Sequence, residues 1–572
     1  MSYFCKTAVV LCLILFGGIN LFAQLALKNT NWSSNYQISA EGKVNLQFGD
    51  DKLMVINTNK TETISVMSFE QRQNTLIISS TSGKNSCETE TGLYQITYQN
   101  SGQILSLAAI QDLCGYRKNL FVNSQTFSFV PDENSAPRDW LQSDAEKGLI
   151  AGINLSKAYE LLKGRPSKTV IVAVIDNGVE IDHEDLKNSI WTNTKEIPGN
   201  GIDDDHNGYV DDIHGWNFRG TKDGTIIENE QSGATQIYAA WKNKYDNAIF
   251  RRLSVNERKE FDIYTKAKKA YLEKLSESKD SNDLKFAYNV KYDSSELIKG
   301  DSKNINARYY GSPLIKLSPN LSHGTHVAGI IAAERNNQIG IDGIADNVLI
   351  MPIVASTAVG DERDKDVANA IRYAVNNGAK VINISFSKTF SPYKKQVDEA
   401  IRYAEKNKIL IVHCAGNDGV DVDSAENYHY PVAIYENGRK AANFITVGWS
   451  RPLFNYRLAH PSSGYGKKNV DLFAPGSDIF STVPNNGYDF KSGSSMSVPC
   501  VSGVVALLLS YFPTLSTAQV REIILRTSFK PNIMVNRPGS KVEVPFSSLS
   551  ATGGIVNANN AVKMAISISE KK

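Results

Sequence analysis

The sequence predicts an α/β fold, a parallel sheet flanked by helices, preceded by a small all-β barrel-like domain. The stretch 170–179 is an apolar, β-branched run that ends in an acid and a turn, which is typical of a fully buried parallel strand. After position 323, strand-like and helix-like stretches alternate as they do in βαβ units. Residues 24–130 instead carry short alternating runs with polar turns, which favour a small barrel or sandwich.

The first residues have the pattern of a secretory signal peptide, which we place at residues 1–23. One early cation, Lys6, precedes an apolar stretch from Ala8 to Phe16 and a candidate cleavage site after Ala23. An uncleaved anchor is the alternative, but the apolar stretch is shorter than the roughly 20 residues that span a membrane. We therefore expect an exported protein, periplasmic or extracellular, with no membrane span in the mature chain.

Four of the six cysteines remain once the signal peptide is removed. In an oxidising compartment they allow three full pairings. Cys87 and Cys114 share the predicted β domain, residues 24–130, and are the expected disulfide. Cys414 and Cys500 are expected to act as small buried hydrophobic residues.

A linker over residues 131–138 leads into the second predicted domain, residues 139–572. The strand at 170–175 is followed by further alternating elements, each recognised by its apolar period. The predicted helices are Leu155–Leu162, 366–376, 393–406 and one after Ala558, and the predicted strands are 380–385, 409–413, 444–447 and one that ends with residues 472–476.

An insertion at about 219–320 interrupts this domain. Its middle, from Ile237 to Leu275, is rich in Lys, Glu, Tyr and Ala with helical spacing, which predicts a solvated helical hairpin. Because the insertion enters just before His323, an overhang of a substrate cleft is the alternative interpretation.

Three local motifs carry the chemistry. Ser495 precedes the apolar run Val501–Leu509, so it is expected at a helix N-terminus, where backbone N–H groups and the helix dipole stabilise an oxyanion. The alternative is an ordinary N-cap serine. Asp176 ends the buried strand, and His323 begins a helix-like run, so an acid, a base and a nucleophile are all present.

The order Asp176, His323, Ser495 and the motifs around these residues resemble the subtilisin-like serine peptidases, the subtilases or S8 family. An α/β-hydrolase would have the order Ser, Asp, His and would need Gly-x-Ser-x-Gly, whereas position 497 is Ser. The resemblance implies a subtilisin-like parallel sheet and a secreted serine endopeptidase that forms an acyl-enzyme on protein or peptide substrates.

The resemblance also implies roles for single residues. His323 is the base, and His326 is expected to be a packed helix residue. Asn417 matches the side-chain donor of the oxyanion hole, although a turn asparagine is the alternative. The family's Ser-Leu-Gly substrate edge is Ser385-Phe386-Ser387 here, so a side chain at 387 crowds that edge. The expected substrate-binding residues are Ser385, Ser387, Ala415 and Gly416.

A second resemblance concerns the β domain. In one spaced set of residues, this domain is similar to the lipocalin-like domains of exported bacterial proteins. The set consists of Cys87, Gly92-Leu93-Tyr94, Leu105-Ser106-Leu107, Asp112-Leu113-Cys114 and Arg117. The prosegment that inhibits many subtilases is not recognisable in this part of the chain.

The loop 200–212 is dense in carboxylates at two-residue spacing. Like charges this close repel unless a cation neutralises them, and oxygen donors favour Ca²⁺. A zinc site through His206 and His214 and an acidic turn without metal are the alternatives. The predicted structural calcium ligands, of which Tyr209 uses its backbone carbonyl, are Asp203, Asp205, Asn207, Tyr209 and Asp212.

Composition bounds the remaining possibilities. The 572 residues are 41% hydrophobic with a net charge of +2, so the chain can bury large cores but has no charge excess that supports a nucleic-acid or anionic-membrane partner. An inactive subtilase-like binding protein would need a broken triad, and a secreted esterase lacks the expected motif order. The oligomeric state is left open.

Overall fold

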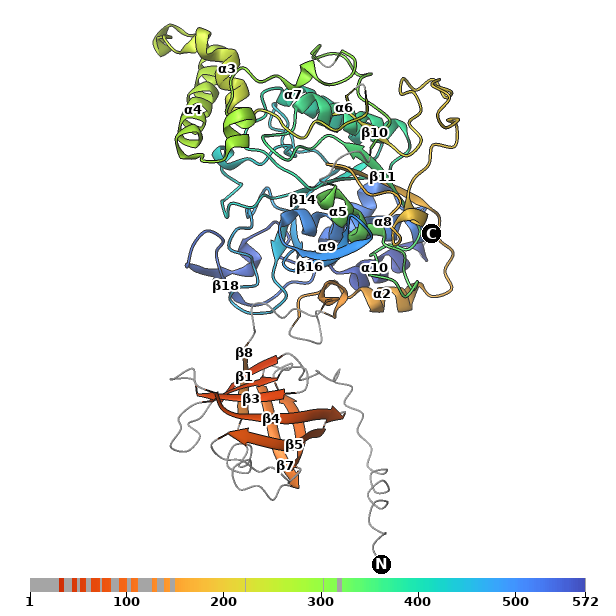
Figure 1. Ribbon diagram of the computed structural model, residues 1–572, viewed down its shortest axis with the longest axis vertical. Coiled ribbons are helices and arrows are strands. Elements are labelled where there is room, and N and C mark those ends of the chain that lie inside the picture. Colours follow the sequence, from red (N-terminus) through yellow and green to blue (C-terminus); the bar gives the residue numbers. More distant parts are fainter. Residues whose placement is uncertain are drawn as a thin grey trace, which may run out of the picture. The chain divides into compact units, whose positions relative to one another are not determined.

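The computed structural model describes thirteen stretches of the chain (Figure 1). They are residues 30–34, 44–48, 52–57, 63–72, 75–83, 92–99, 104–111, 126–130, 138–144, 150–221, 223–301, 303–315 and 321–570. The chain divides into two compact units, Met1–Ser135 and Ala136–Lys572. The predicted signal peptide, the Cys87–Cys114 disulfide and most of the linker lie outside the described residues.

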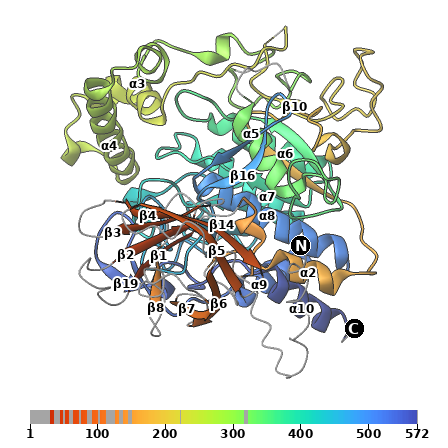
Figure 2. The ribbon, with the colours of Figure 1, turned by 60° about the horizontal axis from the view of Figure 1, so that its bottom comes forward.

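Eight strands of the first unit pair antiparallel in chain order, and β1 pairs with β8, so they form a closed barrel (Figures 1 and 2). Leu46, Leu53, Leu76 and Leu107 are buried, because alternate strand residues point to one side of a sheet. The lipocalin-like assignment and the domain boundaries stay predictions. The strands are β1 Thr30–Ser34, β2 Val44–Phe48, β3 Lys52–Asn57, β4 Thr63–Arg72, β5 Thr75–Gly83, β6 Gly92–Gln99, β7 Ile104–Gln111 and β8 Thr126–Val130.

A seven-stranded sheet, in which every neighbouring pair is parallel, forms the middle of the second unit. The α/β fold class predicted from the alternating elements is therefore confirmed for this unit. In spatial order the strands are β10 Trp216–Asn217, β11 Val348–Val354, β9 Val170–Asp176, β12 Val381–Ile384, β13 Leu410–Cys414, β14 Phe444–Ser450 and β15 Leu472–Pro475.

Helices cover both faces of this sheet. Strand β9 is apolar up to its last residue because its side chains are buried on both faces. Val172 and Val174 lie in the core beneath α5 Ser322–Ala332 and α8 Ser494–Tyr511. Ala173 and Ile175 lie in the core of the opposite face, with α6 and α7. The other helices on the two faces are α2 Leu155–Leu162, α9 Thr517–Thr527 and α10 Ala558–Ser569 on the α8 side, and α6 Asp364–Asn376 and α7 Lys394–Lys406 opposite.

Helix α8 runs through the centre of its layer and packs against β9, β12, β13 and β14. Within the described part of the chain it is the one helix long and apolar enough to cross a membrane, but 89% of it is buried inside the protein. Its apolar composition is therefore that of a core helix.

The described residues also form two short antiparallel sheets and seven short helical turns. They are β16 Ile479–Val483 with β17 Gly487–Lys491, β18 Met534–Asn536 with β19 Glu543–Pro545, the 3-10 turns Trp140–Gln142, Lys187–Ser189, Phe250–Arg252, Ser294–Glu296, Ala425–Asn427 and Phe546–Ser548, and the π turn Asp283–Ala287.

The insertion contains the expected helical hairpin, α3 Gly233–Tyr245 and α4 Val255–Glu277, which lie side by side (Figures 1 and 2). The hairpin buries its own small aromatic core, which includes Tyr245 and Tyr264. At its base, the buried Arg219 pairs with Glu230 at 3.0 Å and with Asp366 of α6 at 3.4 Å, and the second ion pair ties the insertion to the helix layer on the sheet.

Candidate active site

Asp176 and His323 meet at the carboxyl edge of the sheet. Asp176 ends β9, and His323 is the second residue of α5. The His323 Nδ1 atom lies 2.8 Å from Asp176 Oδ1 and 3.0 Å from Oδ2. The side chain of Asp176 is 2% exposed and that of His323 is 36% exposed, so a buried carboxylate holds an imidazole that is open to solvent.

The charge of Asp176 sets the protonation of this imidazole. Burial disfavours the imidazolium, but the charge and hydrogen bond of Asp176 outweigh burial, and the pKa of His323 lies above its ordinary value. Lys491 lowers this pKa and Glu362 raises it, both through their charges.

Ser495 is the second residue of α8, as the sequence predicts, and is half-buried. Its Oγ donates to the backbone carbonyl of Ser385 at 2.6 Å rather than to His323. Catalytic hydrogen bonds are often absent or long in free enzymes and form when substrate binds. The hydroxyl, the imidazole and the acid are thus at one edge of the sheet, with the final Ser–His contact not made.

Asn417 and Gly493 lie beside the start of α8. The Asn417 Oδ1 atom accepts from Ser494 N at 2.9 Å, which leaves the Nδ2 hydrogens of Asn417 free to point elsewhere. A Cβ built on Gly493 would lie 3.7 to 3.8 Å from Asn417 Oδ1 and Nδ2 and from Ser495 N. Gly493 has φ +148°, which also favours glycine. The Asn417 side chain and the Ser495 N–H group therefore lie close together beside Gly493.

The predicted substrate-binding residues lie on adjacent strand ends. Ser385 follows β12 and Ala415 follows β13, and these two strands are neighbours in the sheet. Ser387 is half-buried, whereas Ala415 and Gly416 are buried. The side chain of Ser385 is turned inward, so only its backbone is placed to meet a substrate.

His429 is a neighbour of this edge that the sequence motifs did not indicate. Gly416 has φ +94°, and the His429 ring lies 2.6 to 2.7 Å from where a Cβ on Gly416 would be. The His429 Nε2 atom is 3.2 Å from Asp418 Oδ1. Gly416 and the His429 ring are therefore packed against each other next to Asn417, and a larger residue at position 416 would collide with the ring.

His326 is a packed helix residue, as predicted. It is fully buried, and its Nε2 atom lies 3.0 Å from Ile479 O and 3.1 Å from Asp489 O. Burial lowers the pKa of His326 to about 3, so the ring is neutral and pins the β16–β17 hairpin to α5. Cys414 and Cys500 are also buried and free, as expected.

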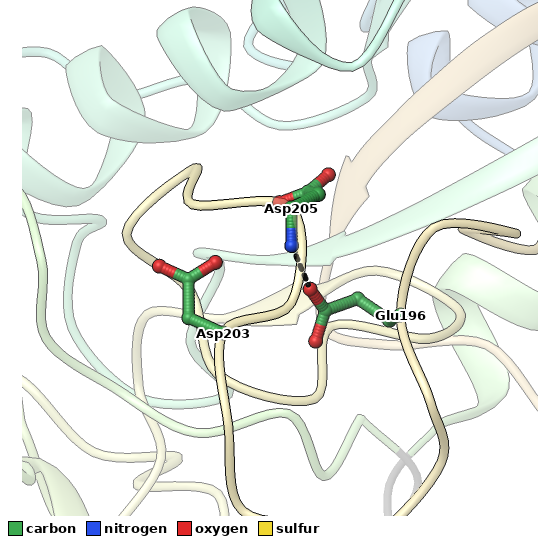
Figure 3. Close-up of side chains that lie close together, drawn as sticks. All are labelled: Glu196, Asp203 and Asp205. Carbon is green, nitrogen blue, oxygen red and sulfur yellow. Dashed lines mark hydrogen bonds between the residues drawn. The ribbon is translucent and has the colours of Figure 1, made fainter.

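The acidic loop folds around its own carboxylates. Asp203 accepts from the backbone N–H groups of Asn207 and Gly208 at 3.0 and 2.8 Å. Glu196, which the loop motif did not include, accepts from Asp205 N at 3.0 Å. The ligand atoms of Glu196, Asp203 and Asp205 lie within 4.8 Å of one another (Figure 3).

The other predicted ligands lie beside this cluster. Asn207 Oδ1 accepts from Tyr209 N at 2.8 Å. Asp212 is fully buried and accepts from the Tyr373 hydroxyl at 2.6 Å, which ties the loop to α6. Burial raises the pKa of Asp212 to about 6. Asp211 Oδ1 is buried without a hydrogen-bond partner in the described part of the chain.

A comparison with known families matches residues 167–548 to the family described as Peptidase_S8, Subtilase family. The matched residues include Asp176, His323, Asn417 and Ser495. The match covers two thirds of the chain and includes every strand of the seven-stranded sheet.

Curated relatives carry the same family name or activity. The chain is 37% identical over 209 residues to "Thermophilic serine proteinase" of Bacillus sp. (strain AK1), covering 36% of this chain and 47% of that protein. It is 25% identical to "Subtilisin-like protease 1" of Plasmodium falciparum (isolate 3D7), covering 76% of this chain and 49% of that protein. The chain thus spans about half the length of these curated relatives.

Among solved structures, the chain is similar to a protease from Pseudoalteromonas arctica PAMC 21717, with a TM-score of 0.44 and 20% identity over 75% of this chain and 100% of that one. A structure titled "Structural basis of subtilase cytotoxin SubAB assembly" also has a TM-score of 0.44 and 20% identity, over 76% and 100%.

Proposed function

This chain belongs to the subtilase family, and on that premise we propose that it is an exported serine endopeptidase with the triad Asp176, His323 and Ser495. The observation that carries the proposal is the short contact between His323 and the buried Asp176, made at the sheet edge where Ser495 begins α8. A histidine held by a carboxylate beside a serine at a helix N-terminus has the parts of an acyl-transfer site.

The proposed reaction has two halves. His323 Nε2 takes the proton from Ser495 Oγ as this oxygen attacks the scissile carbonyl carbon, and it then gives the proton to the leaving amine as the peptide bond breaks. The acyl group remains on Ser495 until water attacks it. His323 takes a proton from this water, the bond to Ser495 Oγ breaks, and the same proton passes from His323 to Oγ as the acid is released. In both halves Asn417 Nδ2 and Ser495 N stabilise the oxyanion.

Substrate is proposed to lie along the adjacent ends of β12 and β13. Ser385–Ser387 would pair with the backbone on one side, and Ala415 and Gly416 would line the other. An extended peptide fits an edge made of backbone groups, so the substrates are proteins or peptides.

The proposal is tested by incubating the mature protein with an unfolded protein and mapping the cut sites by mass spectrometry. We expect internal cleavages that cease with a serine-directed inhibitor. An inactive binding protein would retain the unfolded chain uncut, and an esterase would cleave nitrophenyl esters but leave peptide bonds intact. Either result would contradict the endopeptidase assignment.

The rate should depend on pH through His323. The base works only as neutral imidazole, and its pKa is raised, so activity should rise with pH through a midpoint above the ordinary value of about 6.5. Asp176→Asn removes the charge that raises this pKa, so burial then dominates and the midpoint moves to lower pH. Turnover should also fall by about 10⁴-fold. The check is a profile of kcat/KM against pH for both proteins, and an unshifted midpoint in Asp176→Asn would refute this assignment.

A structural calcium ion is proposed in the acidic loop. The residues fit it because three carboxylates converge, the unpartnered Asp211 Oδ1 is buried nearby, and all the donors are oxygens. Glu196, Asp203 and Asp205 would hold the ion, with Asn207, the Tyr209 carbonyl and Asp212 as the further predicted ligands. The ion would neutralise repulsion between these groups and take no part in bond breaking.

Export and the first domain complete the proposal. We propose that residues 1–23 direct export and are removed, which fits a peptidase acting outside the cytoplasm. The eight-stranded barrel of the first unit supports a lipocalin-like domain, whose role in folding or in restraining activity is open to deletion experiments.

A further inference from the structure

A chain of buried side chains reaches from the middle of α8 to the backbone of the nucleophile. Ser502 Oγ donates to Asn383 Oδ1 at 2.8 Å, and Asn383 Nδ2 donates to Ser385 Oγ at 2.9 Å. Ser385 Oγ then donates to the backbone carbonyl of Ser495 at 3.0 Å. None of the proposed catalytic roles uses these three side chains.

The Ser495 carbonyl needs a donor that its own helix does not provide. In an α-helix this carbonyl accepts from the N–H group four residues later, but position 499 is a proline inside α8 and has no N–H. The proline ring also crowds the carbonyl four residues before it. The Ser385 hydroxyl replaces the missing donor.

Asn383 decides which way the Ser385 hydroxyl points. Its Nδ2 group only donates, so Ser385 Oγ accepts from it and turns its own hydrogen to Ser495. Ser502 in turn occupies the Asn383 carbonyl oxygen and so keeps the amide in this orientation. Water cannot substitute, because the exposed fractions are 0% for Asn383, 1% for Ser385 and 0% for Ser502.

We propose that Asn383 and Ser385 are positioning residues for Ser495, fixing the backbone of the residue that supplies both the nucleophile and an oxyanion donor. This inference rests on the proposed function. The Ser495 hydroxyl also donates a hydrogen bond to the backbone carbonyl of Ser385, so the side chain of each serine donates to the backbone carbonyl of the other. Neither side chain would touch the substrate, so their loss should lower kcat and leave KM nearly unchanged.

The test compares Ser385→Ala with the matched control Ser502→Ala, which removes an equally buried hydroxyl farther from Ser495. Turnover is measured per active site titrated with a fluorophosphonate. We expect kcat to fall about tenfold in Ser385→Ala, the scale of one lost buried hydrogen bond, and less in Ser502→Ala. The thermal midpoint should fall by a similar amount in both variants. If Ser385 had a purely structural role, the two variants would also have equal kcat values, and that result would overturn the proposal.

A rescue experiment tests the proline argument. Pro499→Ala restores an N–H group at position 499, so Ser385→Ala should cost about tenfold in the parent protein and little in the Pro499→Ala background. Equal losses in the two backgrounds would refute the positioning role. The proposed function has a separate control, because it fails only if the parent protein itself does not cleave peptides.

Asn383→Asp gives a further test with almost unchanged shape. A carboxylate accepts from both serines, so it would turn the Ser385 hydrogen away from Ser495. We expect a loss of kcat like that of Ser385→Ala. Undiminished turnover in a folded Asn383→Asp protein would contradict the inference.

Discussion

Ser495→Ala should abolish covalent labelling by a fluorophosphonate and lower turnover by about 10⁶-fold, the size of the loss measured on subtilisin itself. The variant removes the attacking oxygen, and the neighbouring Ser494, the first residue of α8, is fully buried and cannot replace it. The measurements are labelling followed by gel and mass spectrometry, and peptide cleavage under saturating substrate.

Asn417→Asp is the matched comparison. It keeps the oxygen that accepts from Ser494 N but removes the Nδ2 donor and adds a negative charge, so the loop geometry is preserved while the oxyanion loses a hydrogen bond and gains a repulsion. We expect labelling to continue at a lower rate and turnover to fall by at least about 10²–10³-fold, the magnitude that loss of the donor alone has in subtilisin itself. Undiminished proteolysis by Ser495→Ala would end the assignment of the nucleophile, whatever Asn417→Asp shows.

Removing calcium should lower the thermal midpoint of the protein by about 5 °C and speed its self-digestion. A ligand present at about 100 times its Kd adds about 2.7 kcal/mol to the free energy of unfolding, and its loss moves the midpoint by a few degrees. The loop contacts α6 through Asp212 and Tyr373. Trp191, which precedes the loop, donates its N–H to Ile350 O of β11, the strand beside β9, so loosening of this region would reach the strand that carries Asp176.

Asp203→Ala with Asp205→Ala should reproduce the effect of chelation and make the protein indifferent to added Ca²⁺. Glu273→Gln with Glu277→Gln, which changes two exposed carboxylates on α4, is the control and should leave the calcium response intact. The site would be rejected if chelator left the parent melting curve unchanged and elemental analysis found no bound calcium.

Much of the sheet and the ends of its elements could be predicted from the sequence. The β-branched run before Asp176 is apolar at every position because both of its faces are buried, under α8 on one side and α6 on the other. Helix α2 has the bounds Leu155–Leu162 that its period predicts. Asp176 ends one parallel strand, and Ser385 and Asn417 come after two others. Because parallel strands have their carboxyl ends at the same edge of a sheet, the sequence also predicted that these residues lie at one edge.

Other members of the site had weak local signals or none. Asn383 is the single polar residue in the strand Val381–Ile384, which could have marked it, but its partner Ser502 is 119 residues away. Glu196 precedes the acidic loop without any carboxylate spacing. His429 reaches Gly416 from a separate loop.

The sequence by itself determined which residues end a strand or begin a helix, because hydrophobic period, proline and glycine act within a few neighbours along the chain. That was enough to place Asp176 at the end of a strand and His323 and Ser495 at the starts of helices, whereas the choice of His323 as base and of Asn417 as oxyanion donor came from the resemblance to the subtilases. Only the tertiary structure decided that a hydroxyl from β12 replaces the N–H missing at Pro499, and that Glu196 joins Asp203 and Asp205. Such contacts join distant segments, and their geometry depends on how the helices pack on the sheet rather than on any local pattern.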